Sequence, residues 1–291
     1  MGSSGNVVDA AIVTPHPIFP APARRMQVAD KWKPSWFIPV TNTVTMVSMF
    51  THVSNRRYLL ILAIVFAIEW AMLAIHPYDR ADWALENALV AVFVLVLAVT
   101  HRGFPLSRIS YTLIFVFLLL HEIGAHYTYA KVPYDEGFNW LFGFSLNEAL
   151  GFQRNHFDRA LHFVYGLLLA YPVREVFIRI ATVRGFWGYF LPLDITMSTS
   201  MLFELFEWGA AEFFGGDLGM AYLGTQGDVW DAHKDLAFAS LGALIAMLVT
   251  AAINLSLQRD FAAEWSESLR VKIFQPLGEN AIKRMRRKRK H

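Results

Sequence analysis

The chain has 291 residues, of which 55% are hydrophobic and 17% charged, with a net charge of +2 and a mean hydropathy of +0.35. A soluble domain is roughly 45–50% apolar and about 25% charged, so this composition indicates a polytopic membrane protein, and we expect no nucleic-acid partner. The absence of cysteine excludes disulfides, iron–sulfur clusters, thiolate metal sites and a cysteine nucleophile, so any metal must be held by nitrogen and oxygen.

The predicted elements divide the chain into three parts. Residues 1–56 form a polar, proline-rich leader that we expect to be irregular. Residues 57–257 form the membrane domain, and residues 258–291 form an amphipathic tail that ends in a basic run. Six apolar runs, each near the ~20 residues needed to cross hydrocarbon, predict an all-α membrane bundle. These runs are Tyr58–Ile75, Ala84–Thr100, Ile109–His126, His156–Arg179, Phe186–Phe214 and Val229–Leu257.

The distribution of lysine and arginine predicts the orientation of the spans. These residues concentrate in the leader, in the second and fourth connections and in the tail, whereas the other connections carry few of them. Because cytoplasmic loops are enriched in positive charge, both termini are predicted to lie in the cytoplasm and the six spans to cross a bacterial inner membrane.

Four ionisable strings interrupt the apolar runs. They are H-E-I-G-A-H, N-H-F-D-R-A-L-H, E-L-F-E-W and D-V-W-D-A-H-K-D, which begin at His121, Asn155, Glu204 and Asp228. An ionisable group inside a membrane is costly unless it is paired, so each string is a candidate functional site. The predicted orientation places all four near the outer face, which predicts one shared polar centre.

The spacing within these strings places ligand-type groups on single helix faces. Pairs three or four residues apart on a helix are neighbours, and facing helices in bundles hold di-metal sites in this way. We therefore predict a site for one or two Zn, Mn or Fe ions, or for Mg or Ca if only carboxylates bind. The predicted ligands or their supporting groups are Glu122, His126, His156, Asp158, His162, Glu204, Asp228 and Asp231.

Four further residues receive catalytic roles. Glu207 or Asp235 is predicted to be a general acid/base. Arg159 and Lys234 are candidate clamps for an anionic substrate group. The alternative interpretation is a network of salt bridges that uses Arg154, Arg159, Lys131 and Lys234, with Asp228 and Asp231 as acidic residues at a helix start.

Several long strings resemble a family of uncharacterised bacterial inner-membrane proteins labelled YjdF-like. The strings are H-E-I-G-A-H-Y-T-Y, R-N-H-F-D-R-A-L-H-F, P-V-R-E-V-F, E-L-F-E-W and Y-L-G-T-Q-G-D-V-W-D-A-H-K-D, within Arg57 to Ala251. The family pattern has Gln where this chain has His233. The resemblance implies a multi-span inner-membrane fold and implies no reaction.

Three functions follow as hypotheses. The first is a metal-dependent hydrolase or transferase that acts on a lipid or lipid-linked phosphate at the outer face. The second is a divalent-cation or proton-coupled transporter, for which Glu69 and Asp194 are the deep acidic candidates. The third is a structural or accessory subunit of a larger membrane complex. The expected partners are membrane lipids, a lipid-like substrate and membrane-complex subunits.

Overall fold

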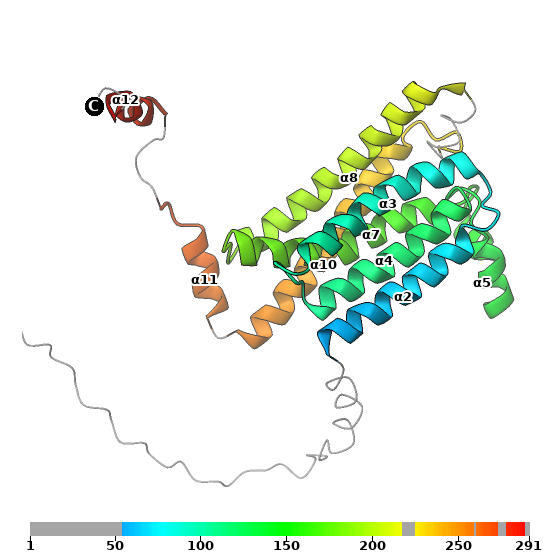
Figure 1. Ribbon diagram of the computed structural model, residues 1–291, viewed down its shortest axis with the longest axis horizontal. Coiled ribbons are helices and arrows are strands. Elements are labelled where there is room, and N and C mark those ends of the chain that lie inside the picture. The colour runs from blue at the N-terminus through cyan, green and yellow to red at the C-terminus, as the bar shows by residue number, and fades with distance from the viewer. Residues whose placement is uncertain (1–53, 217–224, 259, 273–277, 289–291) are drawn as a thin grey trace, which may run out of the picture. The chain divides into compact units, whose positions relative to one another are not determined.

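The computed structural model describes residues 54–216, 225–258, 260–272 and 278–288, and every regular element in these ranges is a helix. Six long helices run alongside one another (Figure 1). They occupy all six predicted apolar runs, so the all-α class is confirmed. These helices are α2 (Asn55–Leu73), α3 (Arg80–Thr100), α4 (Arg108–His126), α7 (Phe157–Ile180), α8 (Trp187–Phe214) and α10 (Asp231–Leu257).

Four of these helices, α3, α4, α7 and α10, are long and apolar enough to cross a membrane. The other two have sufficient length, because a helix of 19 residues is about 28 Å long and hydrocarbon is about 30 Å thick. By composition, however, neither is apolar enough over a continuous stretch: α2 contains Arg56, Arg57 and Glu69, and α8 contains several acidic residues. The number of six spans and the cytoplasmic termini therefore stay predictions.

The closest helix contact joins α7 and α10 and depends on glycine. A Cβ atom at Gly166 would lie 1.9 Å from the carbonyl oxygen of Ala239, and one at Gly242 would lie 2.0 Å from that of Phe163. Only a residue without a side chain fits at either position. In lipid, where helices gain little from burying apolar surface, such close backbone contact is a main source of packing energy.

Apolar side chains extend this contact on both sides of α7. One cluster joins α7, α8 and α10 around Ala170, Tyr189, Ala243, Ala246 and Met247. The second joins α3 and α4 through Val90, Ile114 and Leu118, with Phe66 of α2 packed against it. Helices α4, α8 and α10 thus all pack on α7, while α2 and α3 pack on α4.

The predicted third connection contains two short helices, α5 (Tyr134–Phe142) and α6 (Leu146–Leu150). Asp135 joins them, because its carboxylate accepts hydrogen bonds from the Asn147 amide at 2.9 Å and from Ser145 Oγ at 2.7 Å. The predicted irregular leader lies outside the described residues except at its C-terminal edge, where Ser54 Oγ accepts a hydrogen bond from the Arg57 amide and caps α2.

The predicted tail contains α11 (Phe261–Ser268) and α12 (Gly278–Lys288). Helix α11 packs against the start of α8: Phe261 and Trp265 contact Tyr189, and Glu264 accepts a hydrogen bond from the Gly185 amide. The first part of the tail is therefore a docked element of the membrane domain. Helix α12 carries the basic residues.

Candidate metal centre

Three helices bring ligand-type side chains together near their ends. Asp158 and His162 lie one turn apart at the start of α7, and Asp235 lies at the start of α10. One potential ligand atom of each lies within 4.8 Å of those of the other two. From α8, Glu204 Oε1 lies 3.5 Å from His162 Nε2, which is 3.6 Å from Asp158 Oδ1. We call Asp158, His162, Glu204 and Asp235 the acidic centre.

The acidic centre contains buried oxygens that nothing in the described part of the chain satisfies. Asp235 is 2% exposed and the Glu204 side chain 10%, yet Asp235 Oδ1 and Glu204 Oε1 have no hydrogen-bond partner. A buried charged oxygen is costly unless a proton or a cation pairs with it. Carboxylate oxygens with one imidazole nitrogen are a donor set that suits Zn, Mn or Fe, so the residues fit a divalent metal.

An arginine network lies beside the acidic centre. Arg154 donates to both carboxylate oxygens of Asp231, at 2.7 and 3.1 Å. Arg159 Nη2 donates to Asp228 at 2.5 Å and to Asp231 at 2.7 Å, and Lys234 Nζ donates to Asp228 at 2.5 Å. The ion-pair interpretation thus describes Asp228 and Asp231, which were predicted as ligands. Arg159 and Lys234, predicted as anion clamps, are engaged by the same carboxylates.

The charges of the arginine network and of the acidic centre do not balance. Hydrogen bonds from Lys234 and from the Trp230 amide hold the pKa of Asp228 well below its ordinary value, so this carboxylate is ionised. The network then has three cations and two anions. Arg159 Nε lies 4.0 Å from Asp235 Oδ1, which links the network to the acidic centre. One excess positive charge cannot offset the carboxylates of Asp158, Glu204, Glu207 and Asp235, so further protons or a cation are needed.

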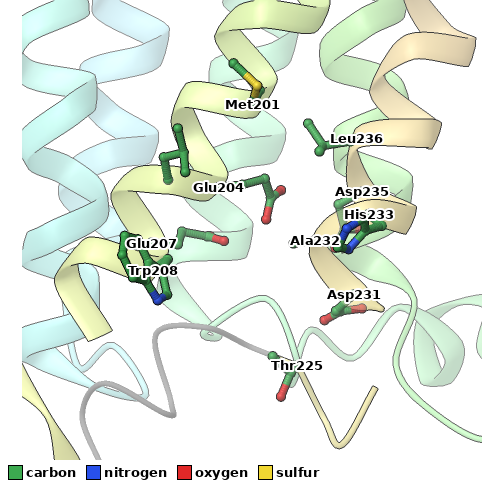
Figure 2. Close-up of a pocket in the computed structure, with 11 residues that line it drawn as sticks. Met201, Glu204, Glu207, Trp208, Thr225, Asp231, Ala232, His233, Asp235 and Leu236 are labelled. Atoms are coloured by element: carbon green, nitrogen blue, oxygen red, sulfur yellow. The ribbon is translucent and has the colours of Figure 1, made fainter. Parts of the chain in front are cut away.

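A cavity of about 320 Å³ opens beside the acidic centre, between α8 and α10. Glu204 and Glu207 reach from α8 toward Asp231 and Asp235 of α10 (Figure 2). The remaining lining is largely apolar and includes Met201, Leu205, Trp208 and Leu236. Leu205 is 51% and Trp208 58% exposed on the outer surface of the bundle. The cavity therefore combines a carboxylate wall with an apolar one.

A second polar group, on α3 and α4, involves residues that sequence reasoning did not assign to the site. Glu86 is 1% exposed and His121 is 6% exposed. The Tyr129 hydroxyl contacts both, at 3.2 Å from Glu86 Oε2 and 2.9 Å from His121 Nδ1. The signal in the sequence was the pair Asp82 and Glu86, four residues apart at the start of the second apolar run and both buried.

The other predicted ligands lie away from the acidic centre. His126 Nδ1 is 2.7 Å from the carbonyl oxygen of Leu73, at the end of α2. The His156 ring packs against Phe152, with their centroids 4.1 Å apart. Glu122 is fully buried on α4, and both of its carboxylate oxygens lack partners in the described ranges. Of the predicted ligand set, the structure brings Asp158, His162 and Glu204 together, and Asp235 joins them.

Comparison with known proteins decides the family. The family described as "Predicted membrane protein (DUF2238)" matches residues 58–255. The inner membrane protein YjdF of Escherichia coli (strain K12) is 37% identical over 188 residues, which cover 64% of this chain and 86% of that protein. The chain belongs to the DUF2238 family. No solved structure matches it.

The DUF2238 match contains the acidic centre, the arginine network and the Glu86–His121 group. The leader, α11 and α12 lie outside it. The predicted YjdF-like resemblance is thus confirmed. With its apolar helices, this DUF2238 chain is an integral protein of the bacterial inner membrane.

Proposed function

We propose that this DUF2238 protein is a divalent-metal-dependent membrane hydrolase or transferase that acts on a lipid or lipid-linked phosphate. The observation that carries the proposal is the acidic centre: ligand atoms of Asp158, His162 and Asp235 lie within 4.8 Å of one another, and two of its buried oxygens have no hydrogen-bond partner in the described residues. Asp158, His162, Glu204 and Asp235 would hold the ion. Two ligands that are each about 2.0–2.2 Å from an ion are at most about 4.4 Å apart, which agrees with the His162 distances of 3.5 and 3.6 Å.

The chemistry assigned to the chain is proton transfer and orientation. A bound divalent ion supplies charge stabilisation at a phosphoryl oxygen and lowers the pKa of bound water. Glu207 lies three residues from Glu204 on the cavity wall and is assigned as the general acid/base. It would take a proton from the attacking water while the bond from water oxygen to phosphorus forms. It would return that proton to the leaving oxygen when the phosphorus–oxygen bond breaks.

The cavity supports an amphiphilic substrate. Its carboxylate wall faces the acidic centre, whereas Leu205 and Trp208 combine a place in the lining with exposure on the outer face of α8. In a membrane that face contacts lipid. A lipid phosphate can therefore enter sideways, with its headgroup toward Glu204 and its acyl or prenyl chain along α8. The arginine network fixes the ends of α7 and α10 that carry the ligands.

The test is metal content together with turnover. Protein purified in mild detergent without chelator is expected to contain Zn, Mn or Fe by mass spectrometry, and Asp235→Asn and Glu204→Gln are each expected to lose one equivalent. Glu207→Gln is expected to keep the metal. In vesicles with phosphatidate or a polyprenyl diphosphate, the Glu207→Gln variant should release phosphate roughly 10²–10⁴-fold more slowly than wild type.

The control is Asp194→Asn, which removes an exposed carboxylate from the same helix α8 and should change neither metal content nor turnover. Unchanged metal in Asp235→Asn would disprove the ligand assignment. Bound metal without phosphate release from either lipid would disprove the substrate class. Absence of metal from the wild type would instead favour a proton-coupled transporter or an accessory subunit.

A further inference from the structure

The hydrogen bonds of Tyr129 favour one tautomer of His121. The Tyr129 hydroxyl has one hydrogen, which it donates to Glu86 Oε2 at 3.2 Å. The same hydroxyl lies 2.9 Å from His121 Nδ1 and, while it donates to Glu86, can only accept a hydrogen bond from that nitrogen, in the tautomer that carries the hydrogen on Nδ1. A neutral imidazole has a single N–H, so His121 Nε2 is left with a free lone pair. Metal-binding histidines are oriented in this way, by a partner on the nitrogen that does not bind the metal.

The free nitrogen of His121 faces a carboxylate at a distance that suits a shared ion. Nε2 lies 3.9 Å from Glu86 Oε2 and has no hydrogen-bond partner in the described ranges. His121 is only 6% exposed. This distance is too long for a hydrogen bond. It fits two ligands on one cation, each about 2.0–2.2 Å away. Two electron-rich atoms that face each other in a buried place need a proton or a cation, and a separation of 3.9 Å leaves room for a cation between them.

The local backbone is built to hold the Tyr129 hydroxyl at this position. Thr128 and Tyr129 have backbone φ angles of 52° and 49°, which residues other than glycine rarely adopt. Gly124 provides the space, because a Cβ atom there would lie 2.4 Å from the Tyr129 ring. Strained residues persist where the surrounding structure enforces them, and they are frequent at functional sites.

The Glu86–His121 group lies on helices that pack beside those of the acidic centre. Glu86 is on α3 and His121 on α4, and α4 packs on α7. On α4, Glu122 adds two buried carboxylate oxygens that have no hydrogen-bond partner in the described ranges. We propose that Glu86 and His121 bind a second divalent cation. This inference extends the proposed metal-dependent function to residues that are not part of the first ion's ligand set.

The test counts bound Mn²⁺. Chelator-stripped full-length protein in detergent is titrated with Mn²⁺ alone, and the free ion is measured by electron paramagnetic resonance. Wild type is expected to bind two equivalents, and His121→Ala and Glu86→Gln one each. The control is His101→Ala, which is expected to bind two equivalents. His101 Nδ1 also lies 3.0 Å from a tyrosine hydroxyl, that of Tyr111, but His101 forms no ion pair in the described ranges. Gel filtration and thermal unfolding establish that each variant is folded.

The outcomes separate the second site from the first. One equivalent in wild type, retained in His121→Ala and lost in Asp235→Asn, would overturn the second site and leave the proposed function intact. One equivalent lost in His121→Ala and Glu86→Gln but retained in Asp235→Asn would support the second site and overturn the first. Two equivalents in folded Glu86→Gln would also overturn the second site, and no binding by wild type would overturn both.

Discussion

At the scale of single residues, partners decide what an ionisable side chain can do. Asp231 and Asp235 are one turn apart on α10, and both are buried. Asp231 accepts hydrogen bonds from two arginines, whereas Asp235 Oδ1 has no partner in the described part of the chain. The first is therefore a structural anchor and the second a candidate ligand. The sequence predicts different roles, with Asp231 as a metal ligand and Asp235 as a general acid/base.

The prediction at the residue scale concerns Asp135. Hydrogen bonds from the Asn147 amide and from Ser145 hold the pKa of its carboxyl below the ordinary value. Because the folded pKa is lowered, this carboxylate stabilises the α5–α6 connection above the ordinary pKa, and its contribution is lost as pH falls through the folded pKa. A carboxyl-carbon NMR titration in micelles should give a midpoint below the ordinary value of about 3.9, and Ser145→Ala should raise it. A midpoint at or above that value would contradict the assignment.

At the scale of elements, the α7–α10 contact positions the site. Asp158 and His162 of α7 and Asp235 of α10 lie about one to two helical turns before the glycine contact at Gly166 and Gly242. Because the backbones approach closely there, direct backbone contact sets the separation of the two helices. Ligand atoms on both helices then keep their mutual distances, which a metal site requires.

The element-scale prediction is that Gly166→Ala destabilises the protein. Alanine is usually about 1 kcal/mol better than glycine in a helix, but here its methyl group would overlap the Ala239 carbonyl. The expected cost is about 1–3 kcal/mol, seen as a lower melting temperature by tryptophan fluorescence in detergent. Gly209→Ala on α8 is the matched control, because its added Cβ meets nothing within 4 Å. Equal melting temperatures for the two variants would refute the close-contact explanation.

At the scale of the whole membrane domain, ionisable groups gather where successive helices begin or end. The acidic centre uses the starts of α7 and α10 and the second half of α8, and the Glu86–His121 group uses the start of α3 and the end of α4. Successive long helices of the bundle run in alternating directions, so these positions meet at one end of it. The remaining turns of these helices carry few ionisable side chains, which favours insertion into lipid.

The prediction at this scale concerns topology. Because the chain has no cysteine, single cysteines report on their own positions without background. A membrane-impermeant maleimide should label Glu136→Cys on intact cells, because the third connection is predicted to face outward. Arg102→Cys and Lys272→Cys should react only after the membrane is opened. All three positions are exposed in the structure. The reverse pattern would invert the orientation, and labelling of Arg102→Cys but not Lys272→Cys on intact cells would refute an even number of spans between these two positions.

The sequence alone determined the class, the helices and the membrane location, because apolar length and helical spacing are local properties that a single chain segment displays. It also predicted one shared polar centre of eight ligand residues, of which the structure brings Asp158, His162 and Glu204 together. Only the tertiary structure assigned partners: Arg154 and Arg159 take Asp231, Asp235 is left without a full set of partners, and Tyr129 orients His121 toward Glu86. Such pairings depend on helix rotation and separation, which long-range packing sets and no local pattern encodes.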